Sequence, residues 1–144
     1  MGNSTAHIRE FCFSKDFKHV HNLWKTAGKG IQLGFSDTPD EIKKKLTRDP
    51  DLFLIAEASG EIVGTVLGGF DGRRGMIYHL AVKKSHRKSG IGSTLMKELE
   101  ARLKVKGCTR SYLLVTRDNS EAISFYKTEG WEEMDLSAYG KDMD

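Results

Sequence analysis

LAVKKSHRKSGIGSTL, at residues 80–95, is the stretch that decides the fold. Its apolar start closes a predicted strand at residues 76–82. Its end opens a predicted helix at residues 90–106, in which apolar residues recur at every fourth position. A basic loop with two glycines joins them. Because the first N–H groups of a helix lack intrahelical partners and carry partial positive charge, this unit predicts an anion-binding site.

The loop alone also fits two simpler interpretations, a solvated lysine-rich loop or an ordinary tight turn from strand to helix. The phosphate-binding pattern GxxxxGK[ST] is absent. The dinucleotide pattern GxGxxG also fails, because Gly90 and Gly92 are followed by Leu95 where a third glycine is needed. The nature of the anion therefore depends on the rest of the chain.

The surrounding pattern alternates strands and helices. We expect strands at residues 7–13, 52–57, 61–67, 111–116 and 131–139, and helices at residues 16–27, 39–49 and 118–128. Gly28 and Gly30 end the first helix, and Thr38 starts the second as its N-cap, in a capping box with Glu41. Strands joined by short turns are antiparallel, whereas a helical crossover makes residues 76–82 and 111–116 parallel. The fold class is α/β, with a mixed sheet covered by helices on both faces.

Composition describes an ordinary globular chain. Of the 144 residues, 38% are hydrophobic and 30% are charged, which suits one domain over residues 1–144. No apolar run approaches the ~20 residues of a spanning helix, so no membrane association is expected. Cys12 and Cys108 are far apart and no signal peptide is evident, which favours a cytoplasmic protein. The net charge of +3 is too small to predict nucleic-acid binding.

Three separated motifs resemble those of the GNAT superfamily of acetyltransferases. Residues 87–92 resemble its pyrophosphate loop, Gln/Arg-x-x-Gly-x-Gly/Ala, and the Leu-Ala-Val at residues 80–82 matches the strand before that loop. Asn119 and the FYKTEGW at residues 125–131 match its later Asn and Phe-Tyr-x-x-x-Gly-Phe/Trp helix. The resemblance implies a mostly antiparallel sheet of six to seven strands with about four helices. Its central parallel pair would splay apart around acetyl-CoA.

The resemblance also implies a cofactor site. Backbone groups of residues 80–82 would pair with the pantetheine amides, and the loop and helix start would hold the pyrophosphate. The cofactor-binding residues it implies are Leu80, Ala81, Val82, Arg87, Lys88, Ser89, Gly90, Ile91, Gly92, Ser93, Asn119 and Tyr126. The 3′-phosphate would meet Lys83, Lys84 or Lys88, among which the sequence does not choose. Asn119 caps its helix, binds the cofactor, or does both.

Tyr126 resembles the family tyrosine that donates a proton to the departing thiolate as general acid. A phenol, with an ordinary pKa near ~10, is protonated at neutral pH as this role requires. The alternative is that Tyr126 packs in the core, the role we expect for Phe125.

The general base is the least constrained part of the site. His79 is the leading candidate, because an imidazole titrates near neutral pH, although a strand histidine also serves structural roles. Glu57, Tyr78 and Asp71 are weaker candidates. No metal is expected, since His19 and His21 are two residues apart on a predicted helix and do not share a face.

The expected reaction is a single-step acetyl transfer to a primary amine of a small molecule or peptide, within a ternary complex. Residues 28–47 would shape the acceptor pocket, and the basic residues 43–45 either favour an acidic acceptor or form a solvated helix face. The rival function is a non-catalytic acyl-CoA-binding sensor or partner module. A homodimer is a further possibility.

Overall fold

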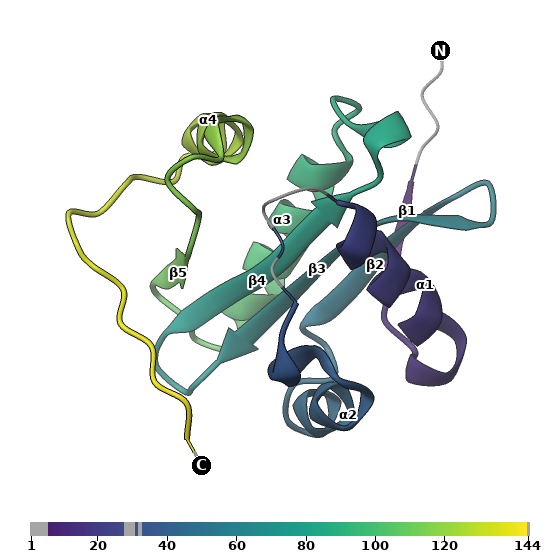
Figure 1. Cartoon of the computed structure of the whole chain (residues 1–144), viewed down its shortest axis with the longest axis horizontal. Coiled ribbons are helices and arrows are strands. Elements are labelled where there is room, and N and C mark those ends of the chain that lie inside the picture. The colour runs from purple at the N-terminus through teal and green to yellow at the C-terminus, as the bar shows by residue number, and fades with distance from the viewer. Residues whose placement is uncertain (1–5, 28–30, 32, 144) are drawn as a thin grey trace.

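The structure is a computed structural model that describes residues 6–27, 31 and 33–143. Its elements are, in chain order, β1 (His7–Glu10), α1 (Phe13–Thr26), η1 (Phe35–Asp37), α2 (Pro39–Arg48), β2 (Phe53–Ala58), β3 (Glu61–Phe70), β4 (Gly75–Val82), η2 (Lys84–His86), α3 (Ile91–Val105), β5 (Ser111–Leu113) and α4 (Ser120–Thr128). The order matches the predicted alternation as far as α4, with η1 and η2 as unpredicted short 3₁₀ turns, and the described residues contain no strand after α4 (Figure 1).

The described residues form a five-stranded sheet in the order β1-β2-β3-β4-β5. The first four strands are antiparallel neighbours, and β5 lies parallel to β4, as the crossover helix predicts. The prediction of six to seven strands is therefore too high. The mixed, mostly antiparallel character of the sheet is confirmed.

Helices cover both faces of the sheet, and each face has its own apolar cluster (Figure 1). On one face, Val20, Leu23 and Trp24 of α1 and Ile42 of α2 pack on Phe53. On the other, the leucines that recur in α3 lie fully buried against β2 and β3. The predicted helical periods therefore face the sheet.

The spacing between α3 and β3 depends on glycine. A Cβ at Gly68 would lie 2.8 Å from Leu99 Cδ1, so a side chain there would push the helix away from the sheet. Gly68 therefore allows α3 to pack closely against β3 at Leu99.

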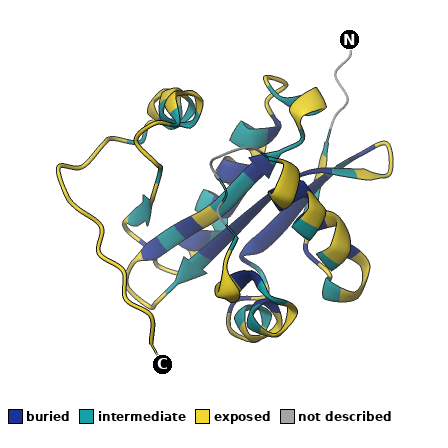
Figure 2. Ribbon diagram, viewed as in Figure 1, coloured by how far each residue is buried: buried dark blue, intermediate teal, exposed yellow. Residues whose placement is uncertain are grey.

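Two predicted features near the ends of elements are wrong. Residues 131–139 form no strand, and most side chains beyond Trp131 are exposed (Figure 2). At α2, Thr38 occupies the N-cap position, but its hydroxyl donates to the Phe35 carbonyl at 2.9 Å and makes no capping box with Glu41. The predicted end of the first helix at Gly28 and Gly30 lies outside the described residues.

Candidate active site

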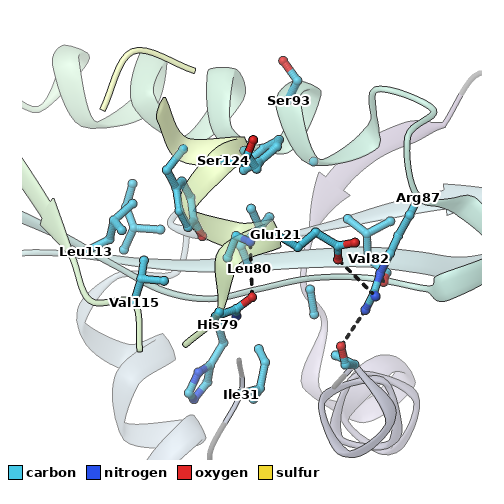
Figure 3. Close-up of a pocket in the computed structure, with 18 of the residues that line it drawn as sticks. Ile31, His79, Leu80, Val82, Arg87, Ser93, Leu113, Val115, Glu121 and Ser124 are labelled. Atoms are coloured by element: carbon cyan, nitrogen blue, oxygen red, sulfur yellow. Dashed lines mark hydrogen bonds and ion pairs between the residues drawn. The ribbon is translucent and has the colours of Figure 1, made fainter. Parts of the chain in front are cut away.

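The central parallel strands separate soon after they begin. Pairing between β4 and β5 covers only Gly75–Ile77 against Ser111–Leu113, so β5 is shorter than the predicted strand at residues 111–116, and its residues are half-buried. Beyond Ile77 the edge of β4 that faces β5 borders a cleft of about 1210 Å³. Figure 3 shows the cleft with Leu113 and Val115 on one side and Leu80 and Val82 on the other.

A β-bulge interrupts β4 inside this cleft. Thr65 pairs with Ala81 and Leu67 with Tyr78, so His79 and Leu80 together oppose the single residue Val66. His79 has a φ of 43°, a left-handed value that is rare for a residue with a side chain. Backbone strain of this kind persists where surrounding contacts hold it, and it occurs often at functional sites.

The side chain of His79 contacts residues on the face of the sheet that α1 and α2 cover. Its Nε2 lies 2.7 Å from Oδ1 of Asp37, a carboxylate whose residue is only 5% exposed. Its ring also meets the buried ring of Trp24 edge to face, with centroids 4.9 Å apart. In Figure 3 the His79 ring points toward Ile31, on the side of β4 away from Ser93 and Ser124.

The loop before α3 presents backbone donors. Gly90 is the N-cap of α3 with a φ of 88°, a conformation that favours glycine. Thr94 N donates to the Gly90 carbonyl at 3.0 Å, which leaves the N–H groups of Ile91, Gly92 and Ser93 in the unpaired first turn. A Cβ at Gly90 would meet nothing within 4 Å, so the first turn is open on that side.

Several side chains of this loop are already engaged. Ser89 Oγ donates to the His86 carbonyl, Ser93 Oγ donates to Glu129 Oε1 at 3.0 Å, and Ile91 is buried in the core. Lys88 is exposed and lines the cleft with a φ of 62°. The predicted anion site therefore consists mainly of main-chain N–H groups.

Arg87 lines the cleft but is tied to three segments around it. Its Nε donates to the Val82 carbonyl at 3.1 Å and its Nη2 to the Ala27 carbonyl at 2.5 Å. Its Nη1 lies 3.7 Å from Glu121 Oε1 on α4. Of the lysines considered for the 3′-phosphate, Lys83 pairs with Glu61, whereas Lys84 lines the cleft as Lys88 does.

Helix α4 brings two predicted residues to the cleft. Asn119 Oδ1 accepts a hydrogen bond from Ala122 N at 3.2 Å, so the capping role is confirmed. Tyr126 lines the cleft between the rings of Phe125 and Trp131, and burial raises its pKa to about 12. The phenol is therefore protonated across the physiological pH range.

The other candidate bases are occupied elsewhere. Glu57 accepts from Arg9 Nε at 2.9 Å, which lowers its pKa, and it lies outside this cleft. Asp71 accepts from the main-chain N–H groups of Arg74 and Arg73 in its turn, which lowers its pKa. Tyr78 lines the cleft, and burial raises its pKa. His79 is the predicted base candidate with both a carboxylate partner and a place in the cleft.

Asp37 is the residue that the sequence did not single out. It stands 42 positions before His79 and belongs to no motif, so only the fold brings the two together. Residues 28–30 and 32 of the predicted acceptor region lie outside the described residues, whereas Ile31 lines the cleft.

Two kinds of site are absent from the part of the chain that the structure describes. In that part of the chain, no group of three or more His, Cys, Asp or Glu side chains is arranged to hold a metal ion. No helix there has the length and apolar character needed to cross a membrane.

Comparison with known proteins identifies the family of the chain. The model of the acetyltransferase (GNAT) family matches residues 7–131. An acetyltransferase of Pectobacterium atrosepticum is 40% identical over 126 residues, which cover 88% of each chain. Ard1 of Thermoplasma volcanium superposes with a TM-score of 0.76 at 28% identity, over 87% of this chain and 81% of its own.

A PaiA N-acetyltransferase of Thermoplasma acidophilum, solved with coenzyme A, has the same fold. Its TM-score is 0.77 at 23% identity, over 92% of this chain and 93% of its own. The family match spans most of the chain and includes the splayed strands, the loop and α4. The chain belongs to the acetyltransferase (GNAT) family and is an N-acetyltransferase.

Proposed function

We propose that the protein transfers an acetyl group from acetyl-CoA to a primary amine of a small molecule or peptide, by direct attack while both substrates are bound. The observation that carries the proposal is the early separation of β4 from β5. It leaves the backbone of β4 from Tyr78 onward unpaired by β5 along a cleft that ends at the first turn of α3. An extended ligand with amides at one end and phosphates at the other suits such a surface.

The residues present fit acetyl-CoA. The edge of Leu80–Val82 that β5 leaves unpaired offers main-chain groups to the pantetheine amides, as an added strand does, and the Val82 carbonyl on it also accepts from Arg87 Nε. The N–H groups of Ile91, Gly92 and Ser93 suit the pyrophosphate. Lys84 and Lys88 line the same cleft and suit the 3′-phosphate. Coenzyme A bound to the PaiA enzyme, which shares the fold, supports this assignment.

Acetyl-CoA supplies the activated acetyl group, to which the amine nitrogen adds as the C–S bond breaks. The chain has two tasks, to remove a proton from the attacking nitrogen and to stabilise the departing sulfur. His79 is our candidate for the first, because its side chain retains 20% exposure at the cleft. Tyr126 is our candidate for the second.

Burial of Tyr126 raises the pKa of its phenol, and this limits the part that the residue can take in the reaction. A phenol with a pKa of about 12 is always available as a donor. A phenol is a weaker acid than a thiol, with ordinary pKa values near ~10 and ~8.5, so complete proton transfer from Tyr126 to the thiolate is uphill. We therefore assign Tyr126 a hydrogen bond to the sulfur that strengthens as negative charge develops, with proton transfer as its limit.

A panel of amines tests the proposal. Peptides with free N-termini, lysine, other amino acids, polyamines and xenobiotic amines are each mixed with acetyl-CoA, and the free thiol is followed. Amine-dependent thiol release, together with product that has gained one acetyl group, is the expected result. Thiol release that no amine stimulates, alongside a rise in melting temperature with acetyl-CoA, would favour the binding-module alternative. The absence of any such rise would remove the cofactor assignment.

A further inference from the structure

We infer that Asp37 is a positioning residue for the transfer reaction, which holds the His79 ring in the tautomer that leaves Nδ1 free to take the proton of the acceptor amine. The inference rests on the proposed function and adds to it a residue from η1. The proton moves from the amine nitrogen to His79 Nδ1 as the C–N bond forms, and the electron pair of the broken C–S bond stays on sulfur.

The tautomer follows from the chemistry of the two partners. A carboxylate only accepts hydrogen bonds, and a neutral imidazole carries one N–H and one lone pair. Since Nε2 of His79 lies 2.7 Å from Asp37 Oδ1, the proton belongs on Nε2. The lone pair is then on Nδ1, the nitrogen that the dyad leaves available. A carboxylate behind a catalytic histidine has this effect in serine hydrolases as well.

The carboxylate is itself fixed. Asp37 Oδ2 accepts a hydrogen bond from Gly34 N at 2.9 Å, so both oxygens have partners and the residue has little freedom to rotate. It lies at the end of η1, directly before α2, whose Ile42 is anchored in the core. The segment predicted to shape the acceptor pocket, residues 28–47, thus also supplies the partner of the base.

The ring of His79 is fixed as well. The bulge in β4 puts His79 and Leu80 opposite Val66, and at this irregular position, with a φ of 43°, the His79 ring contacts Asp37 and Trp24. The edge-to-face contact with Trp24 forms an apolar wall behind the imidazole. A strained backbone, a buried carboxylate and an aromatic wall all act on one side chain that borders the cleft.

A purely structural role for Asp37, as a cap of η1 through Gly34, makes a different prediction, and Asp37→Asn separates the two. The amide oxygen of asparagine still accepts from Gly34 N, whereas its NH₂ group donates toward Nε2. His79 must then carry its proton on Nδ1 and loses its free lone pair toward the amine. The variant therefore keeps the cap and reverses the tautomer.

The first measurement is the ¹⁵N NMR signature of His79 in the intact protein at a pH where the ring is neutral. We expect protonated Nε2 in the wild type and protonated Nδ1 in Asp37→Asn. A wild-type ring protonated on Nδ1, or one whose tautomer does not change in the variant, would overturn the inference. This readout does not depend on activity, so it remains decisive even if the amine panel contradicts the proposed function.

The second measurement is turnover with an accepted amine. Asp37→Asn should lower kcat about 100-fold or more while leaving the coenzyme A-induced melting shift intact. The double variant Asp37→Asn/His79→Gln should be no slower than His79→Gln alone, because Asp37 acts through His79. Independent, multiplying losses would contradict the dyad.

Asp49→Asn is the matched control. Asp49 is equally buried, at 5% exposure, and pairs with Lys45 at 2.6 Å. This variant should lose stability but retain kcat and the His79 tautomer. A similar loss of kcat in Asp49→Asn would show that loss of a buried carboxylate in this part of the fold is enough, and would overturn the specific role of Asp37.

Discussion

Arg87 Nη2 donates a hydrogen bond to the Ala27 carbonyl at 2.5 Å, and this bond ties the loop before α3 to the end of α1. Ala27 is the C-cap of α1, where carbonyl groups lack helical partners and carry partial negative charge. The arginine predicted to bind phosphate is thus a brace that holds the loop in place. Its contribution to cofactor binding is expected to be mainly indirect.

Arg87→Met should therefore reduce stability. Hydrogen bonds from a charged group to two carbonyls are lost, and because the side chain is 30% exposed we expect a decrease of only about 1–2 kcal/mol in the free energy of unfolding. Urea denaturation measures it. Lys88→Met, in the same loop but exposed, should leave the midpoint nearly unchanged. Equal midpoints for Arg87→Met and the wild type would show that the brace contributes nothing.

A pair of substitutions at Gly92 tests the anion site. A Cβ at this position would lie 3.3 Å from Phe125 Cζ, so Gly92→Ala asks only for a small shift of that ring. Gly92→Glu adds a carboxylate at the first turn of α3, where it competes with the pyrophosphate for the same N–H groups. We expect acetyl-CoA to raise the melting temperature of Gly92→Ala but not of Gly92→Glu. A full rise in melting temperature in both variants would show that the pyrophosphate does not bind at the first turn of α3.

Tyr126→Phe tests the leaving-group donor. The change keeps the ring contacts with Phe125 and Trp131 and removes only the hydroxyl. Loss of a donor that acts in the transition state should lower kcat by about 10²-fold with little change in coenzyme A affinity. Thiol release under saturating substrates measures kcat, and the ligand-induced melting shift reports binding. Wild-type turnover in the variant would leave Tyr126 with a packing role only.

The sequence predicted elements whose signal is local. The apolar period of α3 and the hairpin of β2 and β3 are both present, because periodicity and turn residues are read within a few positions. The predicted strand at residues 111–116 is longer than β5, and the predicted strand at residues 131–139 is not formed. Strand formation needs a partner, and β5 loses its partner where β4 diverges, which local pattern does not reveal.

The candidate site divides in the same way. The loop at residues 87–92 and the segment at residues 119–131 are contiguous motifs, and the structure brings both to one cleft. Asp37 and the left-handed backbone of His79 were not predicted, because they arise from contacts between η1, α1 and the β4 bulge. The contacts of the Arg87 side chain with two protein carbonyls were not predicted either, because the Ala27 carbonyl comes from a distant part of the chain.

Stability toward acid should depend on Asp16. Burial of this carboxylate acts to raise its pKa, but hydrogen bonds from Arg9 and from Cys12 N outweigh burial, and the pKa lies below its usual value. A carboxyl whose pKa is lower in the folded state stabilises the fold above its unfolded pKa, near ~3.9, and this stability is lost as the pH falls through the folded value.

We therefore expect the free energy of unfolding to fall between about pH 5 and pH 2, with Asp16 contributing to the slope. Asp16→Asn keeps an acceptor for Cys12 N but loses the ion pair with Arg9, so it should be less stable than the wild type at pH 7 by about 1–3 kcal/mol. The difference should shrink as the pH decreases, because protonation removes the same charge in the wild type.

Glu57→Gln, on the other side of Arg9 and more exposed, should show a smaller effect of the same sign. A difference between Asp16→Asn and wild type that stays constant from pH 7 to pH 2 would mean that the ion pair with Arg9 does not stabilise the fold.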